Sequence, residues 1–476
     1  MDKHIASKAI DEKSSLIIDV SDKIWEFAEL SLKEEKSAEL FCTILSKEGF
    51  KVDRGICGIP TAFSASFGEG KPVIGILAEY DALSGLSQKG ASVKKEELIP
   101  GGSGHGCGHN MLGAGALGAA IGVKAFLESS KASGTVILYG CPGEEGMASK
   151  AFMARDGEWK KLDAALTWHP SDCNEVVTGR SNSCIQVLYS FKGTASHAAA
   201  APEKGRSALD AVELLNIGVQ FLREHVSDRA RIHYAITDTG GVSPNVVQAK
   251  AEVLYMIRSD KVRETLELKK RVDKIAEGAA LMTETECSVK FLDGMSDTVP
   301  NRTLEEVLYK AFSGTPLPEY TKEERAFAEE LMSTFNGREE VPGIGSDTDN
   351  EYREEIRKLR DSKGNPGIND FLLPHFKGDA FMNASTDVGD VSWLCPTAQI
   401  HAASFPNGCP GHSWQNVSAG YSSLGHKAVI TASKVLSLAV IDLILNEDLL
   451  KKAGKEFEER TASGYACPIP VDAKAE

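Results

Sequence analysis

The residues best suited to chemistry lie in short glycine-rich segments. Residues 104–110 read GHGCGHN and carry one thiol and two imidazoles. Residues 143–146 read GEEG, residues 168–170 read WHP, and residues 411–414 read GHSW. Thiolate, imidazole and carboxylate groups are the usual protein ligands of transition-metal ions. Together the four segments predict a metal-dependent hydrolase.

Each segment is weak evidence when it is taken alone. Cys107 suits a small buried apolar position equally well, and His109 suits a structural one. His169 and His412 have the same bland alternative, a histidine at the end of a strand or in a turn. The metal hypothesis gains weight because these segments follow apolar runs or are flanked by glycine. His105 suits a position behind the ligands equally well, and we leave it out of the predicted ligand set.

The pair Glu144 and Glu145 follows a continuous apolar run over residues 135–141. In a solvated loop such a pair is only a charged surface. At the end of a buried strand, two adjacent carboxylates are costly unless a cation shares them. Neighbouring side chains point in different directions, so one glutamate can bind metal while the other faces the bound water. That division suits metal-assisted hydrolysis, which needs a general base beside the nucleophile.

Composition limits the classes of partner. The formal net charge of −15 argues against nucleic acid and anionic membranes, which need a basic face. Residues 1–6 have no apolar signal-peptide core, and the apolar stretch 428–445 is interrupted by Lys434 and Asp442. The ten cysteines are irregularly spaced, which favours reduced thiols in a cytoplasmic protein. The case for a redox role is weak, because the sequence has no Cys-x-x-Cys pair.

The 476 residues are too many for one ordinary core. The first part alternates helices with apolar strands and predicts an α/β layer with a mostly parallel central sheet flanked by helices. From residue 184 the pattern becomes β-α-β-β-α-β, the order of a ferredoxin-like α+β unit. We therefore expect a catalytic domain formed by residues 1–183 and 298–476, with residues 184–297 inserted into it. The segment 337–370 cannot be assigned.

The motifs carry a resemblance when they are read in order along the chain. His-x-Cys-Gly-His-Asn, Gly-x-Pro-x-Glu-Glu-Gly, Trp-His-Pro, Gly-x-x-Ser-His-Ala and Pro-Gly-His-Ser resemble the dinuclear metal amidohydrolases of the aminoacylase and glutamate-carboxypeptidase family. Residues 408–415 and 467–470 look most like its p-aminobenzoyl-glutamate hydrolase B-subunit group. The resemblance spans most of the chain. It implies a phosphorylase/hydrolase-like catalytic domain with an inserted lid/dimerisation domain.

The resemblance also implies roles for single residues. Glu144 matches the general base, and Asp81 matches an acidic residue that orients a metal ligand. The match of Asp81 is looser, because residues 77–83 read LAEYDAL where the family has Arg-Ala-Asp-x-Asp-Ala-Leu. Either Cys107 or His109 would occupy the bridging position that other branches of the family give to an aspartate. The implied ligands of two divalent ions, Mn or Zn, are Cys107, His109, Glu145, His169 and His412.

Three further roles fall in the inserted domain. His197 matches a lid histidine that polarises the scissile carbonyl, often from the partner subunit. Asn245 and Arg258 match positions that bind the substrate carboxylate. From the residues alone, His197 reads as a surface loop histidine and Arg258 as a cation at a strand end.

The expected reaction is hydrolysis of the amide bond of an N-acyl or N-aroyl amino acid. The first choice of substrate is p-aminobenzoyl-glutamate, giving p-aminobenzoate and glutamate. The alternatives are a dipeptidase, another N-acyl-amino-acid amidohydrolase, or a partner-dependent subunit of a heteromeric amidohydrolase. A homodimer or a heteromer with a related subunit would form through the inserted domain. The sequence leaves open the acyl group, the metal and the choice of partner.

Overall fold

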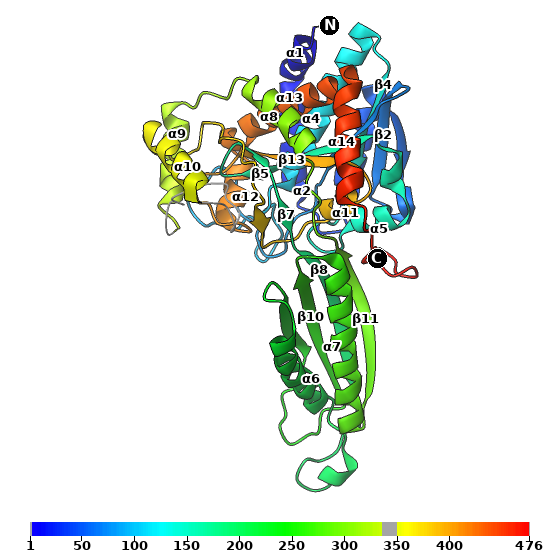
Figure 1. Cartoon of the computed structure of the whole chain (residues 1–476). Helices are drawn as coiled ribbons and strands as arrows, with labels where there is room; N and C mark the ends of the chain where they lie inside the picture. Colours follow the sequence, from blue (N-terminus) through cyan, green and yellow to red (C-terminus); the bar gives the residue numbers. More distant parts are fainter. Residues whose placement is uncertain (1, 336–349, 476) are drawn as a thin grey trace.

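A computed structural model describes residues 2–335 and 350–475. Part of the unassigned segment 337–370 lies outside the described residues. Its described part begins with helix α10 (Asn350–Ser362). Figure 1 shows a large body built around a central sheet and a smaller second unit that extends away from it.

The central sheet has the strand order β1-β2-β4-β3-β5-β13-β6. The four middle strands pair in parallel, whereas β1, β2 and β6 pair antiparallel. The sheet is therefore mixed, and the expectation of a mostly parallel sheet is correct only for its middle. One cause is the short connection between β5 and β6, which consists of residues 172–174. A strand that runs parallel to the one before it needs a connection of about a dozen residues or more, so β6 runs in the opposite direction. The strands are β1 (Lys51–Arg54), β2 (Phe63–Glu69), β3 (Val73–Ala78), β4 (Gly134–Gly140), β5 (Ala164–Ser171), β6 (Glu175–Val177) and β13 (Thr397–Ala403).

Helices cover both faces of this sheet, which confirms the α/β class. Strand β4 contributes side chains to an apolar cluster on each face of the sheet, because successive side chains along a strand point to opposite faces. Val136 and Leu138 lie in one cluster, and Ile137 and Tyr139 lie in the other. The first cluster includes residues of α1 (His4–Glu12), α2 (Ser14–Phe27), α3 (Glu35–Lys47), α4 (His109–Ser130), α8 (Arg302–Ser313) and α13 (Ser423–Leu445). The second includes residues of α5 (Ser149–Arg155) and α11 (Val388–Ser392).

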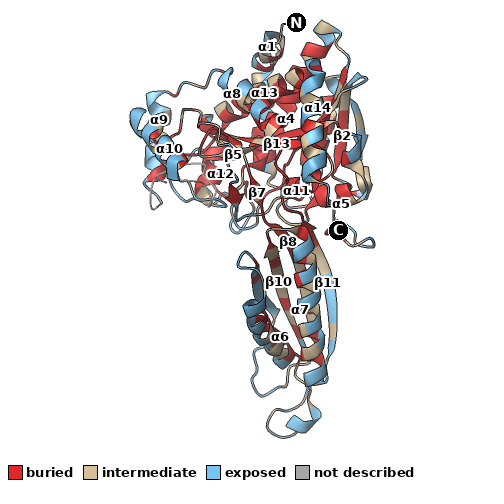
Figure 2. Ribbon diagram, viewed as in Figure 1, coloured by how far each residue is buried: buried red, intermediate tan, exposed pale blue. Residues whose placement is uncertain are grey.

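Helix α4 is rich in small residues because it packs closely against the sheet. A Cβ at Gly115 would lie 2.5 Å from the ring of Trp168 on β5, so a larger side chain would push the helix away. Helices α4 and α13 are both long and apolar enough to cross a membrane, but 89% and 72% of their most apolar stretches are buried inside the protein. Their place in the core accounts for this apolar character (Figure 2).

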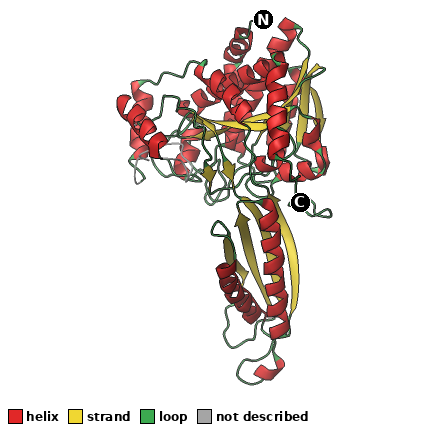
Figure 3. Cartoon of the chain, in the orientation of Figure 1, coloured by secondary structure: helices red, strands yellow, loops and turns green. Residues whose placement is uncertain are grey.

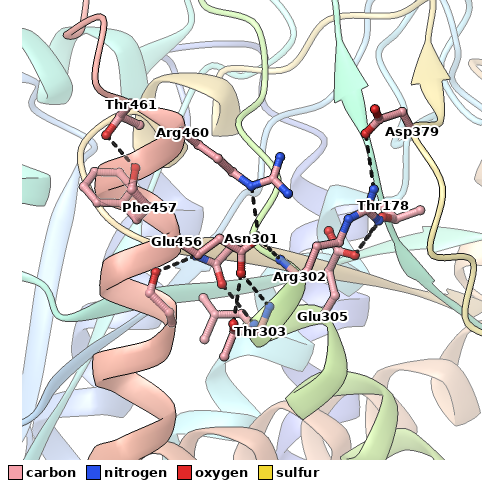
Figure 4. Close-up of polar contacts among 12 residues, drawn as sticks. Thr178, Asn301, Arg302, Thr303, Glu305, Asp379, Glu456, Phe457, Arg460 and Thr461 are labelled. Atoms are coloured by element: carbon pink, nitrogen blue, oxygen red, sulfur yellow. Dashed lines mark hydrogen bonds and ion pairs between the residues drawn. The ribbon is translucent and has the colours of Figure 1, made fainter.

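Polar contacts fasten helix α14 (Glu447–Arg460) to α8 (Figure 4). The Glu456 carboxylate accepts hydrogen bonds from the main-chain N–H groups of Arg302 and Thr303 at 2.8 and 3.0 Å. Asn301 caps α8 by accepting from the Leu304 N–H at 3.1 Å, while its amide donates to the Ala453 carbonyl. Two late segments are thereby held together beside the central sheet.

The second unit is a four-stranded antiparallel sheet with the order β11-β8-β10-β9. Its chain order is β8 (Ser183–Lys192), α6 (Ala208–Leu222), β9 (Arg231–Asp238), β10 (Lys250–Ser259), α7 (Val262–Thr283) and β11 (Glu286–Met295). Both helices pack on one face of this sheet, where they share an apolar cluster with alternate residues of β8 and β10 (Figure 3). The opposite face carries the other set of alternate side chains.

The remaining elements are short or peripheral. Strands β7 (Arg180–Ser181) and β12 (Phe381–Met382) pair in parallel near the junction of the two units. The outer helices are α9 (Lys322–Met332) and α10, whereas the short helix α12 (Trp414–Gly420) is mostly buried.

Candidate metal centre

The predicted ligands come together at one edge of the central sheet. Parallel strands β3, β4 and β5 end beside one another, and polar side chains follow each of them. Asp81 follows β3, Glu144 and Glu145 follow β4, and His169 lies near the end of β5. The carboxyl edge of such a sheet is the usual place for a ligand site.

The start of helix α4 supplies the thiol and one imidazole. Gly108 precedes the helix with φ of 83°, a left-handed conformation that glycine adopts without strain. This turn places Cys107 just before the helix and His109 at its first residue. His412 reaches the same place from the loop before α12.

Five candidate ligands form two donor groups that share one thiol. Donor atoms of Cys107, His109 and His169 lie within 4.8 Å of one another, as do those of Cys107, Glu145 and His412. The Cys107 Sγ lies 3.3 Å from His169 Nε2, and His412 Nε2 lies 3.4 Å from Glu145 Oε1. Cys107 is shared by these two groups, and His109 is shared by the first of them and a third group with Glu79 and Glu144, so both choices that the sequence left open stay candidates for a bridging ligand.

The imidazole of His109 is oriented by a carboxylate behind it. Its Nδ1 lies 2.8 Å from Asp81 Oδ1, and the second oxygen of Asp81 accepts from the main-chain N–H of Glu145 at 2.9 Å. His169 is fixed similarly, with Nδ1 2.7 Å from the carbonyl of Pro170. His169 thus presents Nε2 to the thiol, whereas His109 Nε2 lies 3.2 Å from Glu79 Oε2. Asp81 therefore contacts the ring of a predicted ligand, and carboxylates in this position set the ring orientation of metal-binding histidines.

The site fits a cation on its own chemistry. His109 Nε2 and Glu145 Oε1 are buried and form no well-oriented hydrogen bond, although Glu79 Oε2 and His412 Nε2 lie 3.2 and 3.4 Å from them. Burying such atoms is costly unless something else satisfies them. Burial raises the pKa of the Cys107 thiol and lowers the pKa of His169 to about 4. Neutral imidazole is the form that binds metal, and a cation would restore the thiolate.

The adjacent glutamates differ in their electrostatics. Burial, together with the charges of Glu79 and Asp387, raises the pKa of Glu144 well above its usual range. Burial would also raise the pKa of Glu145, but the contact with the His412 imidazole at 3.4 Å and the charge of His109 lower it overall. Two neighbouring carboxyls with opposite shifts suit two roles, one for a proton acceptor and one for an ionised ligand.

A buried ion network lies behind the site, and the sequence patterns do not predict it. Lys150 is fully buried, and its Nζ lies 2.6 Å from both Glu79 Oε1 and Asp387 Oδ1. The other oxygen of Glu79 lies 3.2 Å from His109 Nε2. One signal was available, because Glu79 and Asp81 are two residues apart at the end of a strand. Nothing near Lys150 or Asp387 in the sequence indicates their pairing.

A cavity of about 570 Å³ opens over the donor groups. It is lined by Glu144, Glu145, His169 and His412 on one side and by Arg258 of β10 on another. The Arg258 guanidinium donates to the Ser385 hydroxyl at 2.7 Å. The predicted base and this predicted substrate-binding cation therefore share one cavity.

His197 and Asn245 do not reach this cavity in their own chain. Both are exposed, and the chain around them forms its own contact, with the Ala198 N–H donating to the Asn245 carbonyl at 3.0 Å. The loop after β8 lies at the end of the second unit that points away from the body (Figure 1). His105 lies outside both donor groups, with Nε2 2.9 Å from the carbonyl of Ile24.

Two further clusters of donor atoms are present among the described residues. One combines the predicted ligand His109 with Glu79 and Glu144, and the other lies outside the predicted set. Cys173, Glu175 and His401 lie together, and His401 Nδ1 is 2.7 Å from Glu175 Oε1. His401 and Glu175 face each other on paired strands β13 and β6, so their contact also joins the edge of the sheet.

Comparison with known proteins gives a consistent result. The sequence matches peptidase family M20/M25/M40 over residues 75–359. It is 44% identical over 474 residues to the B subunit of p-aminobenzoyl-glutamate hydrolase from Escherichia coli K12, covering 97% of this chain and 96% of that protein. It is also 26% identical to the Xaa-Arg dipeptidase of Mus musculus, covering 96% and 92% of the two chains.

The fold is shared with solved structures. A Bacillus subtilis protein described as a dinuclear metal binding peptidase of the M20 family superposes with a TM-score of 0.54 at 17% identity. The match covers 91% of this chain and 99% of that one. The resemblance inferred from the ordered motifs is confirmed, and the chain belongs to peptidase family M20/M25/M40.

Proposed function

We propose that this enzyme hydrolyses the amide bond of N-acyl or N-aroyl amino acids, with p-aminobenzoyl-glutamate as the first substrate to test. The observation that carries the proposal is Glu144 in one cavity with two donor groups that share Cys107. The name of the relative at 44% identity supports the choice of substrate. A dipeptide is the second candidate, supported by the Xaa-Arg dipeptidase at 26% identity.

Two divalent ions, Mn or Zn, would be held by Cys107, His109, Glu145, His169 and His412. A bound metal lowers the pKa of its water to about 7 and so supplies the nucleophile. Glu144 would accept the proton of that water and return a proton to the leaving amine. Arg258 would bind the substrate carboxylate with its guanidinium. A thiolate ligand favours zinc, while the nitrogen and oxygen ligands also admit manganese.

The second unit, residues 184–297, would be a ferredoxin-like lid inserted between catalytic segments 1–183 and 298–476. Its exposed loops suggest that His197 and Asn245 serve the cavity of a partner chain, where His197 would stabilise the developing oxyanion. The partner would be a second copy or a related subunit. The relative from Escherichia coli is named as one subunit of a hydrolase, which supports the related subunit. Ten unpaired thiols support a cytoplasmic location.

The test is hydrolysis by the purified chain after loading with zinc or manganese. We expect p-aminobenzoyl-glutamate to give equal amounts of p-aminobenzoate and glutamate, measured by chromatography, and a chelator to stop the reaction. N-acetyl-glutamate and an alanyl-arginine dipeptide serve as competing substrates. Activity that appears only after a related subunit is added would assign the chain to a heteromer. No hydrolysis of any of these substrates, with or without that subunit, would contradict the proposal.

A further inference from the structure

The face of the second sheet that carries no helices forms one wall of the cavity. Side chains alternate along a strand, so residues two apart share a face. At the end nearest the body, this face presents pairs from three neighbouring strands, and all six side chains line the cavity: Cys184 and Gln186, Met256 and Arg258, and Asp293 and Met295. The wall thus combines three sulfur-containing side chains with three polar groups.

Asp293 is the unusual member of this wall. Its side chain is 2% exposed, and its Oδ1 atom has no hydrogen-bond partner. A buried acceptor left unpaired is costly, and nearly all such groups in native proteins are paired. Asp390, another buried carboxyl, shows the usual arrangement, because it accepts from Ser296 and Tyr465. An unpaired acceptor in a cavity wall points to a donor on the molecule that fills the cavity.

Arg258 does not supply that donor, although its charge acts on Asp293. The hydrogen bonds of its guanidinium go to Ser385 at 2.7 Å and to the Met256 sulfur at 2.8 Å. Strand β8 separates the strands of the two residues, which puts their main chains roughly 10 Å apart. Burial raises the pKa of Asp293 to about 7, and the positive charge of Arg258 opposes this shift. The wall therefore offers a cation and a separate acceptor to one bound molecule.

We propose that Asp293 is a substrate-binding residue that accepts a hydrogen bond from an amino group on the acyl part of the substrate. The proposal rests on the proposed amide hydrolysis and narrows it. The preferred substrates are acyl amino acids with a carboxylate for Arg258 and an amine for Asp293. An aromatic amine such as that of the p-aminobenzoyl group meets this requirement, and an unsubstituted benzoyl group does not.

The experiment compares p-aminobenzoyl-glutamate with benzoyl-glutamate in the metal-loaded enzyme and its Asp293→Ala variant. We expect the wild-type preference for the amino compound, measured as a ratio of kcat/KM, to fall ~10-fold or more in the variant. The activity toward benzoyl-glutamate should change less than about threefold. Comparing ratios between the two enzymes cancels the electronic effect of the amino group on the amide.

A matched pair of variants separates recognition from stability. Asp293→Leu and Asp390→Leu each remove the acceptor oxygens of a buried carboxyl while keeping the approximate size of the side chain, but Asp390 has its own hydrogen-bond partners. We expect only the change at Asp293 to lower the substrate ratio. Equal losses for both substrates in the Asp293 variants would show that the carboxyl merely balances Arg258, and would overturn the proposal.

Binding provides a readout that does not depend on turnover. Calorimetry should show p-aminobenzoate binding more tightly than benzoate to the wild type, and with equal affinity to Asp293→Ala. Wild-type protein that binds both compounds equally would overturn the role of Asp293. Protein that binds selectively but hydrolyses neither amide would instead contradict the proposed function.

Discussion

Replacing Glu144 with glutamine is expected to lower kcat by about 10²–10⁴-fold while both metal ions stay bound. Glutamine keeps the shape of the side chain but cannot accept the proton of the attacking water. The five proposed ligands remain in this variant. Glu144 lies outside both groups that share Cys107, although it forms another donor group with Glu79 and His109. The measurements are steady-state kinetics on p-aminobenzoyl-glutamate and metal content by elemental analysis.

Glu145→Gln is the matched control, one residue away. Its Oε1 lies 3.4 Å from His412 Nε2 in a donor group with Cys107, so this change should lower the metal content as well as the rate. Reversed results, with metal lost from Glu144→Gln and retained in Glu145→Gln, would show that the two roles are assigned the wrong way round.

Replacing Lys150 with methionine is expected to lower the free energy of unfolding by about 3–5 kcal/mol. The substitution removes the cation between two buried carboxylates, Glu79 and Asp387, and leaves both negative charges uncompensated. Those charges hold the pKa of Lys150 well above its usual range despite burial. Urea unfolding in the presence of a chelator measures the loss without a contribution from bound metal.

A surface pair gives the comparison for this prediction. Lys71 forms an ion pair with Asp163 at 2.8 Å, but its side chain is 70% exposed. Lys71→Met should therefore cost less than about 1 kcal/mol. Adding Glu79→Gln and Asp387→Asn to Lys150→Met should recover part of the lost stability, because the charges are then absent. A loss below about 1 kcal/mol for Lys150→Met would contradict the view that this network is a charge-balanced unit.

The donor residues could be predicted because their signals are local. Cys107 and His109 share one turn, Glu145 lies in the loop after β4, and His169 lies near the end of β5. Because parallel strands end at the same edge of a sheet, these residues are expected to lie close together. The element order of the second unit was equally readable, because its periodic patterns are long.

Other features depend on contacts that no local pattern records. Lys150 and Asp387 are 237 residues apart, and their pairing arises only when α5 and the chain before α11 pack together. The antiparallel pairing at the edges of the central sheet likewise depends on which strands become neighbours in the fold, and the pattern within a single strand does not record this. The motif around His197 is visible in the sequence, and the resemblance implies that it often acts on a partner subunit, but the residues alone indicate only an exposed loop histidine.

The proposed chemistry depends on a two-metal site around Cys107. Crystals grown with zinc and measured at the zinc absorption edge would test it most directly. We expect two anomalous peaks in each chain, one among Cys107, His109 and His169 and one among Cys107, Glu145 and His412. A single peak, or a peak among Cys173, Glu175 and His401 with none beside Cys107, would contradict a dinuclear site at this edge of the sheet.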